Sequence, residues 1–534
     1  MKKDRLAGLL AGKYFILCAV LGIAAFLRFY GLNGKCLWYD EVCSLNLSAY
    51  NWYDIFLSQK VLTDIPRPVY YALLKLWTGL FGYTEVAARS LAVIFGVLSV
   101  FLIYKLAKTL FGASAGLISA FILAISPYNI YYSQQVRYYT LFLCLSLVSI
   151  ILFLKVIKSD KRSLRFLYIL TNALILYSFP VGIYVFILQN IFFLVFSKRI
   201  RLKRQWLRMQ VIILVIFMPM AVLPAVAFTQ NTRNQEIDTF IADKPGYRDL
   251  IGTFGVFSYG GPRQAHAGVG FETEPSRLRV IRFLTVLLGL LFSLSIFYSR
   301  KEIRSNEDIL SAKNKILLLW LWLLAPLLGF YLFSIWVKPV FLTRYFIAIA
   351  PAFYIGAAYS VSRMGRGRLP AIVALVALTF FSWDILYNPG SNDDWRSLAS
   401  SVKPQIAEGD VLVFAPITQI IPFWYYYKYG QVKGFNNNID NHGEKFYHMK
   451  NCRFLDGANT VIGLGIRQDR EHVLVTLGGL PDNDANIWLI ISPHWRGNEH
   501  SGLIEGLLGK GRGVKYRKYF DYNGVEAICY SPSG

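Results

Sequence analysis

Long apolar runs recur as far as residue 387, and they constrain the fold more than any other feature of the chain. Crossing the hydrocarbon core of a bilayer takes about 20 helical residues at roughly 1.5 Å rise per residue. Hydrophobic residues make up 55% of the chain and charged residues only 16%, against about 25% charged in soluble domains. The sequence therefore predicts a polytopic α-helical membrane protein. Its predicted spans number eleven: 14–31, 87–107, 113–132, 138–157, 166–180, 181–197, 209–228, 280–298, 316–335, 345–361 and 369–387.

Pro180 lies between the fifth and sixth of these spans and leaves almost no loop. A proline interrupts a helix because it lacks the backbone N–H and its ring clashes with the preceding turn. The sequence leaves two interpretations open here. Residues 166–197 form either two spans or one longer, kinked re-entrant element.

Basic residues indicate the orientation in the membrane. Lys and Arg gather in alternate loops, at residues 2–13, 105–108, 155–165, 198–208, 300–315 and 363–368. Loops rich in Lys and Arg remain cytoplasmic, so the net charge of +24 reports topology better than it reports nucleic-acid binding. We expect a multi-pass protein of the cell (inner) membrane with a cytoplasmic N-terminus. No small-residue cleavage site follows the first apolar run, which favours a retained anchor over a signal peptide.

The tail after residue 389 has no long apolar run. Helices are predicted over 394–402, 419–430 and 501–508, and strands over 410–416, 486–493, 514–520 and 524–531. Strands that alternate with helices favour a small α/β layer fold. We therefore divide the chain into a transmembrane domain over 1–389 and a soluble α/β domain over 390–534, which an odd number of spans places outside the cytoplasm.

Two adjacent carboxylates, Asp40 and Glu41, closely follow the first span in the stretch "CLWYDEVCSL". They lie at the membrane surface, where a lipid-linked substrate carries its head group. Such a pair is either a hydrated acidic loop or a functional site. Cys36 and Cys43 flank the pair, and their spacing does not decide whether they are bridged.

Two segments after this pair, residues 51–61 and 67–83, are amphipathic and rich in aromatic residues. We expect both to form interfacial helices with Trp and Tyr at head-group level. Lys75 and the short length of the second segment argue against a twelfth span. The sequence also leaves residues 230–279 open, as a segment ordered over a substrate or as a solvated connector.

Further motifs on the same predicted face combine basic and aromatic residues. Each alone is typical of a helix-end anchor. Together they indicate a pocket for an anionic group, and Arg and Lys beside aromatic walls suit a phosphate that carries a sugar. The motifs are "TDIPRPVYY" with Asp64, Arg67, Tyr70 and Tyr71, "EVAARS" with Glu85 and Arg89, "SPYNIYYSQQVRYY" with Arg137 and Tyr138, and "KPVFLTRYF" with Lys338, Arg344 and Tyr345.

These motifs, together with "WYDE", resemble the polyprenyl-phosphate-sugar-dependent glycosyltransferases of the GT-C fold. The likeness is closest to the bacterial group related to protein O-mannosyltransferases and to the aminoarabinose and galacturonic acid transferases of lipopolysaccharide. It covers about residues 10–390 and is strongest over the first 140. The family's catalytic loop aspartate corresponds to Asp40. The family commonly has His-Pro-Pro where this chain has Pro66-Arg67-Pro68. A metal or acid role of a histidine is therefore not carried over to this position. Arg67 is instead an additional candidate for a hydrogen-bond donor to the phosphate.

The resemblance implies inverting transfer of one sugar from a polyprenyl-phosphate donor to an acceptor hydroxyl outside the cytoplasm. The acceptor is lipopolysaccharide or lipid A, another cell-surface glycan or a protein, as in lipopolysaccharide biosynthesis or protein glycosylation. Asp40 would be the general base and basic residues would stabilise the leaving phosphate. Glu41 would orient the loop, although the sequence alone allows the two carboxylates to exchange roles.

Partners and alternatives follow from the same residues. Membrane lipids are expected partners and nucleic acid is not. No cofactor is assigned, because no His or Cys cluster has convincing metal spacing. The sequence does not decide whether a divalent cation takes part. One alternative is a lipid-linked glycan transporter, for which internal repeats and broken midplane helices are not evident. The other is a Wzy-type polymerase or ligase, which by the resemblance lacks the carboxylate pair after the first span.

Overall fold

The computed structural model describes residues 2–57, 67–196, 203–231, 244–259, 275–301, 311–387, 394–407, 409–415, 419–427, 460–463, 485–491, 501–510, 512–520 and 525–532. It divides into two compact units. The first, which we call the membrane unit, comprises Met1–Tyr30, Trp52–Leu73 and Arg89–Tyr387. The second unit comprises Gly31–Asn51, Leu74–Ala88 and Asn388–Gly534.

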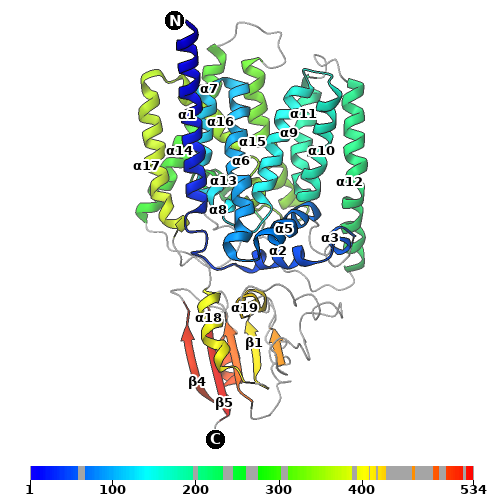
Figure 1. Ribbon diagram of the computed structural model, residues 1–534, viewed down its shortest axis with the longest axis vertical. Helices are drawn as coiled ribbons and strands as arrows, with labels where there is room; N and C mark the ends of the chain where they lie inside the picture. Colours follow the sequence, from blue (N-terminus) through cyan, green and yellow to red (C-terminus); the bar gives the residue numbers. More distant parts are fainter. Residues whose placement is uncertain are drawn as a thin grey trace. The chain divides into compact units, whose positions relative to one another are not determined.

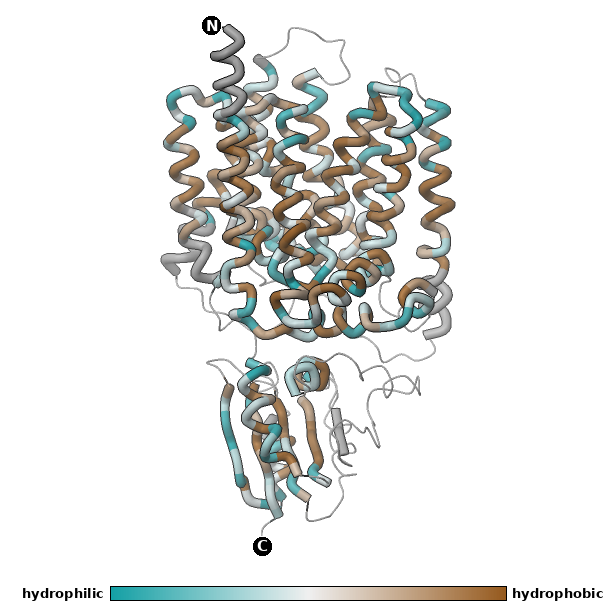
Figure 2. The backbone as a smooth tube through the Cα atoms, in the orientation of Figure 1, coloured by the Kyte–Doolittle hydropathy of each residue, from teal (hydrophilic) through white to brown (hydrophobic). Residues whose placement is uncertain are grey.

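The predicted class of fold, a polytopic helical membrane protein with a C-terminal α/β domain, is confirmed. Each predicted span coincides with one described helix, except 113–132, which corresponds to two. Among the described residues, six helices are long and apolar enough to cross a membrane, and the bent pair α7 and α8 is a seventh candidate. Apolar residues run along these helices (Figure 2). The six are α1 (Lys2–Phe29), α6 (Glu85–Phe111), α9 (Tyr139–Val156), α12 (Lys203–Asn231), α14 (Pro275–Lys301) and α15 (Ala312–Trp336), and the bent pair is α7 (Ala113–Ile125) with α8 (Pro127–Ser133). The other predicted spans correspond to α10 (Arg162–Ser178), α11 (Ile183–Phe196), α16 (Ala350–Arg363) and α17 (Arg368–Tyr387).

Shorter elements connect the helices of the membrane unit (Figure 1). Helix α3 (Trp52–Leu57) and helix α5 (Pro68–Phe81) form within the two segments predicted to be interfacial. With 14 residues, α5 is too short to span a bilayer. Helix α13 (Tyr247–Tyr259) lies between α12 and α14, and a 3-10 turn, η3 (Thr343–Phe346), precedes α16.

Pro180 begins the 3-10 turn η1 (Pro180–Gly182), which separates α10 from α11. A β-carbon at Gly182 would lie only 2.5 Å from a ring carbon of Phe142 in α9. Glycine is therefore required at this turn for α9 and the turn to pack closely. Of the two interpretations left open by the sequence, the structure has two separate helices joined by a tight turn.

The predicted span 113–132 is not continuous, because α7 and α8 meet at an angle of 60°. Pro127 is the first residue of α8, where its missing N–H costs nothing, and the Ser126 side chain caps the new helix at the Asn129 N–H. Ending α7 here leaves carbonyl groups without helical partners inside an apolar bundle.

Arg28 of α1 satisfies these carbonyls. Its guanidinium is fully buried and donates to the carbonyls of Ala124 at 2.9 Å and Leu123 at 3.1 Å, and to the Ser133 hydroxyl at 3.1 Å. The planar fork of five N–H donors suits several acceptors at once. Arg28 therefore serves as a structural cation that fixes the bend between α7 and α8.

Small residues allow the helices of the membrane unit to pack closely. In α6, a β-carbon at Gly96 would lie 2.4 Å from the Ser133 hydroxyl and 3.0 Å from Arg28 Nε. In α16, which packs against α7, α14 and α15, a β-carbon at Gly356 would lie 2.3 Å from the Phe292 ring. The hydrogen bonds of Arg28 and the position of α16 both depend on these glycines.

The second unit contains a five-stranded sheet of order β2-β1-β3-β5-β4. Strand β1 (Val411–Ala415) pairs in parallel with β2 (Thr460–Gly463) and β3 (Ile487–Ile491), whereas β5 (Glu526–Pro532) is antiparallel to β3 and β4 (Arg512–Tyr519). Apart from β2, which the sequence analysis missed, these strands form where they were predicted. So do α18 (Trp395–Val402), α19 (Ile420–Tyr427) and α22 (Ser501–Leu508).

Alternate strand residues of this sheet form two separate cores. Leu412, Phe414 and Trp488 pack with residues of α18 and α19. Val413 and Leu489, of opposite parity along the strands, pack with Ile504 and Leu508 of α22. Because successive side chains of a strand point to opposite faces, the sheet lies between two layers of helices. Cys36, from the segment that follows α1, belongs to the first core.

Candidate functional site

The acidic pair lies in a helix, contrary to the expectation of a loop. Helix α2 (Tyr39–Ala49) begins just after Trp38, and Asp40 and Glu41 occupy its first turn. Carboxylates there are stabilised by the positive end of the helix dipole. The Glu41 side chain is fully buried and accepts a hydrogen bond from the Trp38 N–H at 3.3 Å. Asp40 is half-buried, so it is the more accessible carboxylate of the two.

Helix α2 is also held at its C-terminal end. Lys75 of α5 donates from Nζ to the carbonyl of Tyr50 at 2.6 Å and to that of Ala49 at 3.4 Å. An ammonium group at this position complements the negative end of the helix dipole. Partial burial lowers the pKa of Lys75, and the carbonyl contacts replace part of its lost hydration. The residue that argued against a twelfth span therefore caps the helix that carries Asp40.

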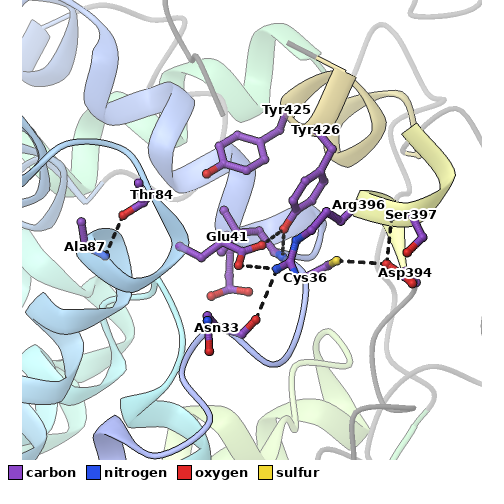
Figure 3. A network of polar contacts seen from close by, with 12 residues as sticks. Asn33, Cys36, Glu41, Thr84, Ala87, Asp394, Arg396, Ser397, Tyr425 and Tyr426 are labelled. Atoms are coloured by element: carbon purple, nitrogen blue, oxygen red, sulfur yellow. Dashed lines mark hydrogen bonds and ion pairs between the residues drawn. The ribbon is translucent and has the colours of Figure 1, made fainter. Parts of the chain in front are cut away.

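A polar network holds the segment that leads into α2 (Figure 3). The Glu85 carboxylate pairs with Arg396 at 2.5 Å and accepts a hydrogen bond from the Tyr426 hydroxyl. The same Tyr426 oxygen accepts the Leu37 N–H at 2.6 Å. No disulfide bond joins Cys36 and Cys43. Glu85 belongs to one of the predicted motifs, whereas no local pattern marks Arg396 or Tyr426, which lie more than 300 residues further along the chain.

In the membrane unit, two of the predicted basic residues lie close to the ring of Tyr138. The Arg67 guanidinium lies 4.4 Å from the centroid of its ring, and the Arg137 guanidinium lies 5.1 Å from it. Both arginines are buried, with 3% and 6% of their surface exposed. Tyr70 meets the Tyr138 ring edge-on at 6.0 Å, and Arg67 also donates to the hydroxyl of Tyr71 at 3.3 Å.

Phe179 connects this arrangement to the motif before α16. Its ring stacks on Tyr138 at 4.7 Å and lies 5.5 Å from the Tyr345 ring. Arg344 lies 5.7 Å from the centroid of Tyr345, and both Arg67 and Arg344 interact electrostatically with the Tyr345 phenol. We call this set the arginine–tyrosine cluster: Arg67, Tyr70, Arg137, Tyr138, Phe179, Arg344 and Tyr345. Phe179 was not among the predicted residues, and its signal in the sequence is its position directly before Pro180.

The structure describes most of the remaining predicted residues. Arg89 is buried in α6, next to the region where Thr140 at the start of α9 donates to the Ala92 carbonyl at 2.9 Å. Lys338 is exposed between α15 and η3. Asp64 lies outside the described residues, as do most of residues 230–279.

The described residues offer no metal centre. No group of three or more His, Cys, Asp or Glu side chains within them is arranged to hold a metal ion. The arginine–tyrosine cluster can instead hold an anion, because guanidinium groups bind phosphate bidentately and ring faces hold cations in place.

The chain is similar to known proteins in one segment of its sequence and over its whole fold. No curated protein sequence matches it. Residues 64–223 match the family described as dolichyl-phosphate-mannose-protein mannosyltransferase. Among solved structures, ArnT from Cupriavidus metallidurans in the apo state is 12% identical, with 98% of each chain covered and a TM-score of 0.59.

Two further solved structures have the same fold. ArnT bound to undecaprenyl phosphate is 13% identical, covers 96% of this chain and 97% of its own, and has a TM-score of 0.54. The oligosaccharyltransferase of Archaeoglobus fulgidus in complex with Zn and sulfate is 13% identical, covers 97% of this chain and 73% of its own, and has a TM-score of 0.53. The family match and the shared fold together confirm the predicted enzyme class, a membrane glycosyltransferase with the GT-C fold.

Proposed function

We propose that this GT-C glycosyltransferase transfers a sugar from a polyprenyl-phosphate-linked donor to an acceptor hydroxyl, with inversion at the anomeric carbon. The observation that carries the proposal is the arginine–tyrosine cluster, in which Arg67 and Arg137 lie close to the Tyr138 ring and Arg344 lies close to Tyr345. The ArnT structure with undecaprenyl phosphate supports a lipid phosphate as the group bound.

The arginine–tyrosine cluster would bind the phosphate of the donor. When the bond between the anomeric carbon and the phosphate oxygen breaks, negative charge develops on the leaving lipid phosphate. Guanidinium groups already oriented by aromatic stacking stabilise that charge without reorganising.

Asp40 would be the general base. Its carboxylate takes the proton of the acceptor hydroxyl as the hydroxyl oxygen attacks the anomeric carbon, and the lipid phosphate leaves from the opposite face. A single displacement of this kind inverts the anomeric configuration. Glu41, buried and bonded to the Trp38 N–H, would set the start of α2 and leave the proton transfer to Asp40.

The experiment uses the purified protein in lipid nanodiscs. It is given a panel of polyprenyl-phosphate sugars, and the same sugars as nucleotide diphosphates serve as the matched control. We expect release of polyprenyl phosphate and transfer only from the lipid-linked donors, with inversion detected by NMR of the product. Transfer from the nucleotide sugars alone would contradict the proposal.

We also propose that the N-terminus is cytoplasmic and that α2 and the C-terminal α/β domain lie outside the cytoplasm. The basic alternate loops support this orientation. Cysteines introduced at Ser397, exposed in α18, and at Ser163, exposed in α10, test it in intact cells with a membrane-impermeant maleimide. We expect labelling at position 397 directly, and at position 163 only after permeabilisation. Equal labelling of both positions would contradict the orientation.

A further inference from the structure

We infer that Tyr426, Glu85 and Arg396 are positioning residues through which the α/β domain holds helix α2 and thereby orients Asp40. The inference rests on the proposed function in one respect, which is that Asp40 is the base. The attachments themselves lie wholly within the second unit and are observed independently of any activity.

The segment before α2 is anchored at three points to the α/β domain (Figure 3). The Asn33 carbonyl accepts a hydrogen bond from Arg396 at 3.3 Å. The Cys36 side chain packs in the core formed by α18, α19 and the sheet, and its thiol donates to Asp394 Oδ1 at 3.7 Å. The Leu37 N–H donates to the Tyr426 hydroxyl at 2.6 Å. Residues 33–37 therefore belong structurally to the domain that begins more than 350 residues later.

Tyr426 is the centre of this arrangement because its hydroxyl serves two partners. The oxygen accepts from Leu37 and the O–H donates to Glu85, which uses both roles of a phenol. Burial, the largest contribution, raises the pKa of Tyr426, so the phenol keeps the proton that it donates. Glu85 in turn holds Arg396 through an ion pair, and the hydrogen bond to Glu85 raises the pKa of Arg396.

Only a few residues separate these hydrogen bonds from Asp40. Leu37 is fully buried, Trp38 precedes the helix, and Asp40 lies in the first turn of α2. Helix α19, which carries Tyr426, also packs directly against α2. With Lys75 bound at the other end, α2 is held at both termini.

The expected consequence of loosening the N-terminal attachment is loss of turnover rather than of donor binding. A shift of about 1 Å in a catalytic group can reduce the rate about 10²-fold. The residues proposed to hold the donor phosphate lie in the arginine–tyrosine cluster, so KM for the donor should change little.

The test compares Tyr426→Phe with Tyr425→Phe. Both substitutions remove one hydroxyl from α19, but the Tyr425 hydroxyl donates to the Tyr83 carbonyl at 2.8 Å and not to the segment before α2. We expect Y426F to lower kcat about 10- to 100-fold with KM for a polyprenyl-phosphate sugar within about 2-fold of normal. Y425F should keep nearly normal kcat.

Alkylation of Cys36, quantified by mass spectrometry, gives a readout independent of activity. Burial raises the pKa of the Cys36 thiol to about 11, so it reacts slowly with iodoacetamide at pH 8. We expect Y426F to speed its alkylation several-fold. Cys529 in β5, buried and with its pKa also raised to about 11, should stay slow and so report an intact domain.

The outcomes separate the two proposals. A wild-type protein that transfers no sugar from any lipid-linked donor contradicts the proposed function, while the Cys36 result still decides whether Tyr426 holds the segment. Unchanged Cys36 protection in Y426F, or faster Cys36 alkylation with normal kcat, overturns the inference. If Cys529 is also exposed in Y426F, the milder Arg396→Lys, which retains the charge facing Glu85, and Arg396→Gln are compared instead. A lower kcat in R396Q, with a kcat closer to that of the wild type in R396K, supports the inference. Equal kcat values in the two variants overturn it.

Discussion

Helix α2 is held by hydrogen bonds, whereas the charged groups of the arginine–tyrosine cluster also lie against aromatic rings. Directional hydrogen bonds fix α2 at both ends, through Tyr426 to Leu37 and through Lys75 to Tyr50. In the arginine–tyrosine cluster, the guanidinium groups lie 4.4 to 5.7 Å from the centroids of tyrosine rings, and Arg67 adds a hydrogen bond to the Tyr71 hydroxyl. Hydrogen bonds weaken steeply with angle, whereas attraction between a cation and a ring tolerates some lateral displacement.

This contrast suits the two tasks assigned to the two regions. A base must meet one proton along one direction, so its helix needs rigid attachment. A phosphate offers several equivalent oxygens, so nearby cations can share it and partly substitute for one another. We therefore expect substitutions in α2 to have abrupt effects and substitutions in the arginine–tyrosine cluster to have graded ones.

The largest expected effect is that of Asp40→Asn, which retains size and hydrogen bonding but removes basicity. Turnover should fall roughly 10²- to 10⁴-fold, with folding and donor binding nearly intact. Single-turnover kinetics with a lipid-linked donor measures the loss. Asp54→Asn in α3 is the matched control and should retain activity. A well-folded D40N protein with near-normal turnover would move the assignment to Glu41 or Asp64.

A smaller, graded effect is expected in the arginine–tyrosine cluster. Arg344→Ala should lower turnover and weaken donor binding about 10- to 100-fold, because one guanidinium no longer stabilises the leaving phosphate. Arg344→Lys should recover part of the loss, since the charge returns without bidentate geometry. The rate measured against donor concentration separates the two effects.

Lys338→Ala provides the comparison for that series, because Lys338 is exposed. It should change donor binding much less than R344A. An unchanged donor dependence in R344A would remove Arg344 from the donor site. Equal effects of R344A and K338A would contradict the distinction between a stacked arginine and an exposed lysine.

The smallest expected effect concerns stability, at the buried Arg28 of the membrane unit, which hydrogen bonds hold in place. Gly96→Ala should destabilise the protein by about 1–3 kcal/mol, because the added β-carbon overlaps the Ser133 hydroxyl beside Arg28. Thermal unfolding in detergent measures the change. Gly22→Ala in α1, where a β-carbon meets nothing within 4 Å, should not lower stability. Equal melting temperatures for the two variants would show that the side chains around Arg28 adapt to the added β-carbon with no loss of stability.

Much of the architecture follows from the sequence because its signals are local. The positions of the spans, the two short helices after α2 and most of the α/β elements appear as runs or periodicities of apolar residues within one element. The same locality explains why Arg67, Arg137 and Arg344 could be selected, since each lies beside tyrosines in its own motif. Strand β2, with four residues, offered too short a run to be recognised.

Tertiary structure alone decided how the polar groups pair. Nothing local marks Arg28 as the partner of the carbonyls left at the end of α7, or Phe179 as the ring between Tyr138 and Tyr345. The pairing of Glu85 with Tyr426 joins residues 341 positions apart. A buried polar group needs a partner, but its own sequence neighbourhood does not say which one, because any correctly oriented donor or acceptor satisfies it. The apolar pattern therefore determined where the helices lie, and the packed fold determined which charges they bring together.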